Sequence, residues 1–144
     1  MTAKQYLQSY RRIEGQYLAA IEEYQSVEND MITLKSPNFD ERVQTSAKSD
    51  PIGDIVIKLE DQKGKIGMQI VNYRSQMLLI RNQISDMDKI DEDFCVILLL
   101  RYVLNKDWKF VCSSLNLSRA QANIVHGKAL LEFDRIYGQN YCNR

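Results

Sequence analysis

The sequence predicts an all-α protein, in which a long antiparallel helical hairpin is followed by a C-terminal unit of three shorter helices. Three observations predict this class. Apolar side chains recur at alternating steps of four and three residues over the first third of the chain and again over its middle, as in coiled coils. Only two Pro and six Gly occur among 144 residues, which leaves long stretches free to be helical. In the last third, shorter apolar segments are separated by polar breaks.

The first predicted helix covers about residues 3–34. Its apolar side chains form an unbroken heptad seam, which predicts a long amphipathic helix that packs against another helix. The seam comprises Tyr6, Tyr10, Ile13, Tyr17, Ala20, Tyr24, Val27, Met31 and Leu34. The next segment, residues 35–50, is polar and is predicted to form a loop.

The second predicted helix covers about residues 51–87. Asp50 is suited to cap its first turn, and Pro51 fits the first helical position. All but one of its heptad positions are apolar; they are Ile52, Val56, Leu59, Lys63, Ile66, Ile70, Tyr73, Met77, Ile80, Ile84 and Met87. Two such helices bury both seams most simply as an antiparallel coiled-coil hairpin, so residues 1–88 are predicted to be an N-terminal domain. Any seam left exposed favours a homodimer formed through this hairpin.

A three-helix unit is predicted for residues 89–144. Its first helix opens with the acidic residues 91–93, which the helix dipole favours in a first turn. Residues 94–103 are apolar nearly all round the helix, which predicts a central position in the core. The second helix is predicted from Trp108 to about Leu115, with an aspartate immediately before it as N-cap.

The last helix is predicted to cover about residues 119–137. Asn116 tolerates a left-handed backbone, and Ser118 is a suitable N-cap for the helix that follows. Gly138 comes directly after Tyr137 and is predicted to stop the helix.

Two helices joined by a three-residue turn make a helix-turn-helix, and the apolar positions fit this motif. The inward-facing positions are Val111, Leu115, Leu117, Ala122 and Val125. The outward side chains of the last helix are then free to meet a partner, and Arg, Gln and Asn can bind guanine and adenine edges with two hydrogen bonds. The predicted DNA-binding residues are Arg119, Gln121 and Asn123 for base edges, Lys128, Lys109 and Lys106 for phosphate, His126 for phosphate or packing, and Ser118 at the helix start.

The charge of the chain is unevenly distributed. Residues 1–100 hold 12 basic and 16 acidic side chains, whereas residues 101–144 hold 7 basic and 3 acidic ones. No acidic residue lies between Asp107 and Glu132. A solvated helix face would have a similar polar composition, but the lack of acidic side chains favours a polyanion as partner, and double-stranded DNA is the predicted one.

The segment "SRAQANIVHGKALLEF" resembles the recognition helix of sigma-factor region four. The segments "LLLRYVLNKDW" and "SDPIGD" extend the resemblance to phage late transcriptional regulators of the ArpU/RinA type. This resemblance implies a helical hairpin followed by a sigma-like helix-turn-helix that activates phage late genes. A further expected partner is the host RNA polymerase, contacted through the hairpin. Ala120 and Ile124 depart from the region-four pattern, which implies a target other than an ordinary −35 element.

The sequence argues against an enzyme. Its single His126 lies eight residues from Ser118 on one helix, about 12 Å apart by helical rise, which is too far for a nucleophile and its base. No Cys/His spacing matches a zinc site, and neither a metal nor a cofactor is predicted. No apolar run reaches bilayer length, no signal core opens the chain, and its three cysteines form no close pair, so the predicted location is the cytoplasm of a bacterial host, away from the membrane.

Two alternatives stay open at this point. Phage terminase small subunits also join a helix-turn-helix to helical oligomerisation segments, so a DNA-packaging protein is one of them. The other is an adaptor that binds RNA polymerase through the hairpin. Ring-like oligomers would favour packaging, whereas a monomer or dimer with promoter-selective binding would favour regulation.

Overall fold

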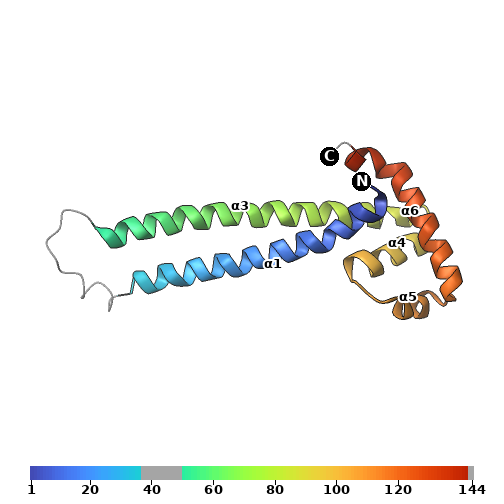
Figure 1. Ribbon diagram of the computed structural model, residues 1–144, viewed down its shortest axis with the longest axis horizontal. Coiled ribbons are helices and arrows are strands. Elements are labelled where there is room, and N and C mark those ends of the chain that lie inside the picture. Colours follow the sequence, from blue (N-terminus) through green and yellow to red (C-terminus); the bar gives the residue numbers. More distant parts are fainter. Residues whose placement is uncertain (37–49, 143–144) are drawn as a thin grey trace. The chain divides into compact units, whose positions relative to one another are not determined.

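The computed structural model describes residues 1–36 and 50–142, and every regular element within these ranges is a helix (Figure 1). The predicted all-α class is therefore confirmed. The elements are α1 (Ala3–Leu34), α3 (Pro51–Asp86), the 3-10 turn η1 (Met87–Lys89), α4 (Glu92–Leu98), the π-helical stretch η2 (Leu99–Val103), α5 (Trp108–Leu115) and α6 (Arg119–Cys142). The loop predicted at residues 35–50 lies outside the described residues, except for Lys35, Ser36 and Asp50.

The chain divides into two compact units. We call Gly15–Arg74 the hairpin unit, and Met1–Glu14 together with Ser75–Arg144 the terminal unit. This grouping differs from the domain boundary expected after residue 88, because the start of α1 and the end of α3 contribute to the C-terminal core. The Tyr6 hydroxyl, for example, donates a hydrogen bond to Gln83 Oε1 at 2.9 Å.

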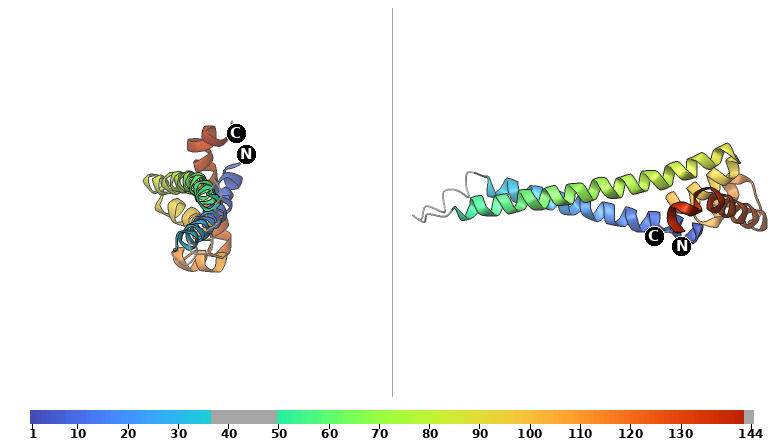
Figure 2. Two further views of the ribbon diagram at one scale, coloured as in Figure 1. Left: turned by 90° about the vertical axis from the view of Figure 1, so that its left-hand side faces the viewer. Right: turned by 90° about the horizontal axis from the view of Figure 1, so that it is seen from above.

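In the hairpin unit, α1 and α3 run antiparallel and lie side by side (Figure 1 and Figure 2). Lys63 Nζ lies 3.1 Å from Glu28 Oε1, and Lys35 Nζ lies 3.5 Å from Glu60 Oε1. The core of this unit consists of the buried residues Ala20, Val27, Met31 and Ile66, flanked by Tyr24, Val56, Leu59, Ile70 and Tyr73. All of these side chains belong to the two heptad seams, so the periodic pattern supplies the entire core cluster of this unit.

Lys63 is the one charged residue of the second seam, and the structure gives it two partners. Its ammonium is bonded to Glu28, and this hydrogen bond raises the pKa of Lys63. The same ammonium lies 5.1 Å from the centroid of the Tyr24 ring. A long lysine side chain can lay its methylene stem along an apolar seam and keep its charge at the edge, which explains how the seam accepts a cation.

The core of the terminal unit is built from six segments. Its fully buried side chains are Leu7 from α1, Ile80 and Ile84 from α3, Met87 from η1, Ile97 and Leu98 from α4, Val111 from α5, and Ala122, Ala129, Phe133 and Tyr141 from α6. The rings of Tyr6 and Tyr141 stack with centroids 4.6 Å apart, and those of Phe133 and Tyr137 lie 4.9 Å apart. Aromatic pairs at these distances add to the apolar burial.

Helix α6 continues to Cys142, so the end predicted at about Tyr137 is wrong. Gly138 lies within the helix. The reason is tertiary: Tyr141 is buried, and its hydroxyl donates to Asp134 Oδ1 at 2.6 Å. The last turn thus gains buried aromatic contact and a hydrogen bond to a charged acceptor. These gains outweigh the cost of about 1 kcal/mol for glycine inside a helix.

Two features of the backbone connect α4 to α5. In η2 the N–H of Leu104 donates to the carbonyl of Leu99, a five-residue step that gives the π-helical geometry. Asn105 then adopts a left-handed backbone with φ of 52°, which asparagine tolerates better than most residues. The chain reverses here and brings the start of α5 back against η2.

Candidate nucleic-acid interface

The start of α5 and the turn before α6 are fixed by local hydrogen bonds. Asp107 Oδ1 accepts from the N–H of Phe110 at 2.8 Å, which caps α5. Asn116 ends α5 with φ of 52° and ψ of 41°, the left-handed conformation predicted for it. Ser118 and Gln121 form a reciprocal capping box, in which the Ser118 N–H donates to Gln121 Oε1 at 3.0 Å and the Gln121 N–H donates to Ser118 Oγ at 3.2 Å.

The inward positions predicted for the helix-turn-helix are covered in the structure. Val111 and Ala122 are fully buried where α5 and α6 meet, and Leu115, Leu117 and Val125 are half-buried. Because these positions face the core, the side chains between them on α6 are turned outward. The element bounds at residues 108, 115 and 119 are also those expected from the sequence.

Most of the predicted DNA-binding residues are exposed; they are Lys106, Lys109, Ser118, Arg119, Gln121, Asn123 and Lys128. They do not form one strip. At about 100° per residue, Asn123 and Lys128 lie about 140° apart around α6, and Arg119 and Gln121 about 160° apart. The outermost line of the helix between these flanks includes Ile124, which is 58% exposed. The polar residues therefore border an apolar centre.

Two of the predicted residues have a structural task in the helix start. The side-chain amide of Gln121 and the hydroxyl of Ser118 are both used in the capping box. A glutamine three residues after a serine N-cap is the sequence signature of such a box, so the capping role of both residues could have been predicted from their spacing.

His126 lies in an aromatic cluster, which we define as Tyr102, Trp108 and His126. The Tyr102 hydroxyl and His126 Nε2 share a hydrogen bond of 3.0 Å, and the Trp108 ring meets the imidazole edge-on at 5.1 Å between centroids. Burial, with smaller contributions from the cations Arg101, Lys4 and Arg119, lowers the pKa of His126 to about 4. At neutral pH this imidazole is uncharged, which fits packing better than phosphate binding.

The sequence reasoning missed three residues of this region: Arg101, Tyr102 and Trp108. Burial raises the pKa of Tyr102 to about 12, so its hydroxyl stays protonated beside His126. Arg101 stacks over the Trp108 ring at 4.6 Å, and Arg119 stacks over the same ring at 4.2 Å. Trp108 is the only tryptophan in the chain, and this could have pointed to the start of α5 as part of the site. The apolar pattern did not predict the π-helical turn that places Arg101 and Tyr102.

The basic side chains of α5, α6 and η2 differ in their pairing. Arg135 bonds to Glu132 at 2.8 Å. Within residues 1–36 and 50–142, by contrast, no carboxylate forms an ion pair with any of the following cations: Arg101, Lys106, Lys109, Arg119 and Lys128. Positive charge is therefore concentrated and uncompensated around the start of α5 and the first half of α6.

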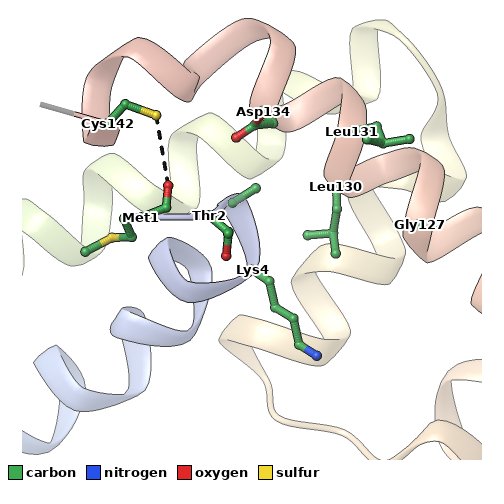
Figure 3. A pocket seen from close by; sticks show the side chains of 9 residues that line it. Met1, Thr2, Lys4, Gly127, Leu130, Leu131, Asp134 and Cys142 are labelled. Atoms are coloured by element: carbon green, nitrogen blue, oxygen red, sulfur yellow. Dashed lines mark hydrogen bonds between the residues drawn. The ribbon is translucent and has the colours of Figure 1, made fainter.

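An apolar groove of about 540 Å³ lies between the start of α1 and one face of α6 (Figure 3). Met1 lies next to Cys142 there, with the thiol sulfur 4.0 Å from the Met1 carbonyl oxygen. Gly127, Leu130 and Asp134 line the groove from α6, together with Leu131, which is 73% exposed. The walls of the groove are mainly apolar and include one lysine, Lys4, and one carboxylate, Asp134. The groove therefore lacks the concentrated positive charge found at the start of α5.

Two kinds of feature are absent from the described residues. No group of three or more His, Cys, Asp or Glu side chains in this part of the chain could hold a metal ion. None of the helices described is both long enough and apolar enough to cross a bilayer.

Comparison with known proteins found no match: no protein-family model fits the chain, and no curated protein or solved structure resembles it significantly. The resemblance to sigma region four and to ArpU/RinA-type regulators thus stays a prediction from the sequence.

Proposed function

We propose that this chain is a sequence-specific DNA-binding protein that regulates transcription, with α6 as its recognition helix. The observation that carries the proposal is the uncompensated positive charge around α5 and the first half of α6. Ion pairs are common on protein surfaces, and they are present elsewhere in this chain. A polyanion is the partner that such a surface attracts most strongly.

The exposure of side chains on α6 supports a narrower choice of base-reading residues. The N-terminal part of a recognition helix enters the major groove, and Asn123 and Ile124 are exposed there. Asparagine can bind adenine with two hydrogen bonds, and an apolar side chain can contact the methyl group of thymine. We assign base reading to Asn123 and Ile124, and phosphate contacts to Lys128, Lys109 and Lys106.

Three predicted residues receive supporting roles in this assignment. Ser118 and Gln121 cap α6 and fix the direction in which it leaves the turn. His126 packs against Tyr102 and Trp108 as a neutral side chain. These residues hold the reading surface in place, and their loss changes DNA binding through the position of the helix.

The test begins with selection of bound duplexes from fragments of the encoding genome, followed by affinity measurement on a selected site by fluorescence anisotropy. Lys128→Ala is expected to weaken binding equally on all sequences and to reduce the slope of log affinity against log salt by about 1. Arg135→Ala is the matched control, because it removes an equal charge from the same helix at a residue already paired with Glu132. Equal affinities and slopes for both variants and the unaltered protein contradict the assignment.

Ile124 offers a sharper test of base reading. In a selected site, each thymine is replaced by deoxyuridine, which removes only the methyl group. One such replacement is expected to weaken the unaltered protein by about 1 kcal/mol and to leave Ile124→Ala unchanged. Equal losses for both proteins mean that Ile124 does not contact that methyl group.

Exposed apolar residues of the hairpin unit favour binding to another protein, and we propose that this partner is a second copy of the chain. Ile57 and Met68 are 65% and 77% exposed, and they lie about 20° apart around α3, on the side away from the seam. Apolar residues in line on a helix favour association with another helix. Sedimentation of the full chain tests this: a dimer that becomes a monomer in Met68→Lys supports it. A ring-like oligomer would favour a packaging role, and a monomer that binds RNA polymerase would favour an adaptor.

A further inference from the structure

Arg101 has a position that the predicted DNA-binding set does not explain. It lies in η2, outside α5 and α6, yet its guanidinium stacks over the Trp108 ring at 4.6 Å. Its Nη1 also donates a hydrogen bond to the carbonyl of Lys106. Two contacts from different directions fix this long side chain, so little conformational freedom is left for it to lose on binding.

Arg119 shares the same ring. Its guanidinium lies 4.2 Å from the Trp108 centroid, so one indole carries two like charges. Neither arginine has a carboxylate partner among the residues that the structure describes. Since both guanidinium groups lie within 5 Å of one ring centroid, the two cations repel each other, and an anion bound near both would relieve the repulsion.

Stacking leaves both guanidinium groups able to bind an anion. Each guanidinium carries five N–H donors, and a cation–π contact with the ring uses none of them as a hydrogen bond. Arg101 uses one donor for the Lys106 carbonyl, so most donors of the two groups are left for an anion. Planar forks of this kind match phosphate oxygens in pairs.

We propose that Trp108 is a positioning residue that holds Arg101 and Arg119 as a two-arginine clamp for the phosphate backbone of duplex DNA. The clamp rests on the proposed function and deepens it, since it adds Arg101 to the interface and moves Arg119 from base reading to the backbone. Arg119 is the first residue of α6, at the place where a recognition helix passes the backbone before it enters the groove.

The experiment measures binding of the full chain to two fluorescent duplexes, one of selected sequence and one of unrelated sequence, over a series of salt concentrations. Arg101→Ala and Arg119→Ala are each expected to weaken binding to both duplexes about tenfold and to reduce the salt slope by about 1. Arg135→Ala is again the matched control, with no change expected. Arg101→Lys keeps the charge but loses the fork, so its affinity is expected to lie between those of Arg101→Ala and the unaltered protein.

Variants at Trp108 separate positioning from charge. Trp108→Leu removes the ring and no charge, and it is expected to weaken binding about as much as Arg101→Ala. Trp108→Phe restores an aromatic face and is expected to recover most of the affinity. The double variant Arg101→Ala/Trp108→Leu is expected to lose less affinity than the product of the two single losses, because the Arg101–Trp108 contact is removed by both changes and only the Arg119–Trp108 contact is lost separately. Thermal unfolding of each variant checks that it is folded at the assay temperature.

The outcomes distinguish the clamp from the proposed function. If the unaltered protein binds neither duplex, the proposed function fails and the clamp fails with it. If it binds, but Arg101→Ala matches Arg135→Ala in affinity and salt slope, the clamp is overturned while DNA binding stands. If Arg119→Ala relaxes sequence preference without changing affinity for the unrelated duplex, Arg119 reads a base and the clamp is likewise overturned.

Discussion

The hairpin unit and the terminal unit share the helices α1 and α3, yet different contacts hold them together. In the hairpin unit, the core cluster comes from two heptad seams that meet in one repeating register. In the terminal unit, side chains from α1, α3, α4, α5 and α6 converge on one core. Periodicity is sufficient where two helices pair, whereas aromatic and polar contacts between distant segments decide the structure where several helices meet.

The largest loss of stability is expected from a substitution in the core of the terminal unit. Phe133 is fully buried and lies near the rings of Tyr6, Tyr137 and Tyr141. Phe133→Ala is expected to lower the free energy of unfolding by about 3–5 kcal/mol, because it removes buried area and leaves a cavity. Urea unfolding measures this, with Leu131→Ala on the same helix as control and an expected change within about 0.5 kcal/mol. Equal small effects of both changes would mean that the aromatic core does not hold this unit.

Acid is expected to weaken the terminal unit through His126. Its pKa is about 4 in the folded chain against about 6.5 in an unfolded one. Below about pH 6.5 the unfolded chain takes up a proton that the folded chain does not. The contribution of neutral His126 to the free energy of unfolding is therefore fully present above about pH 6.5 and is lost as the pH falls toward 4. The groups that face this imidazole are Tyr102, Arg101, Lys4 and Arg119.

The expected loss is about 1–2 kcal/mol between pH 7 and pH 4, reduced from the full shift because the imidazole is only partly buried. Urea unfolding at several pH values measures it. His126→Gln keeps a hydrogen-bonding group but cannot titrate, so its stability is expected to fall less over this range. Parallel pH curves for the two proteins would show that His126 is not the group responsible.

The turn between α5 and α6 gives a smaller effect. Asn116 has φ of 52°, a conformation that costs other non-glycine residues about 1–2 kcal/mol. Asn116→Ala is expected to lower stability by about 1 kcal/mol, whereas Asn116→Gly is expected to preserve it. Denaturant unfolding compares the two variants. A loss from the glycine change as large as that from alanine would assign the effect to the lost amide instead of the backbone.

The smallest expected effect concerns two glycines of α3 in the hairpin unit, Gly64 and Gly53. A Cβ added at Gly64 would meet no atom within 4 Å, so Gly64→Ala is expected to raise stability by about 0.5–1 kcal/mol through helix propensity alone. Gly53→Ala is the contrasting change, because its Cβ would collide with the Asp50 carboxylate that caps α3. Thermal unfolding that shows a gain at Gly53 equal to that at Gly64 would contradict this account of the helix start.

The candidate interface was predictable in part. The caps at Asp107 and Ser118 and the left-handed Asn116 follow from local residue preferences, and the structure has all three. The role of His126 could not be predicted this way, since its burial depends on Tyr102, which is 24 residues away. The stacking of Arg101 and Arg119 on Trp108 depends in the same way on the π-helical turn that brings η2 to the start of α5.

The sequence alone specifies the all-α class and the two long helices, because heptad spacing and turn residues act over a few neighbouring positions. It also determined where α5 and α6 begin, through caps of the same local kind. Tertiary packing, by contrast, explains why α6 runs through Gly138, since the buried ring of Tyr141 makes the extra turn favourable. It also decided that two arginines share one indole, since that contact joins segments whose approach no local pattern specifies.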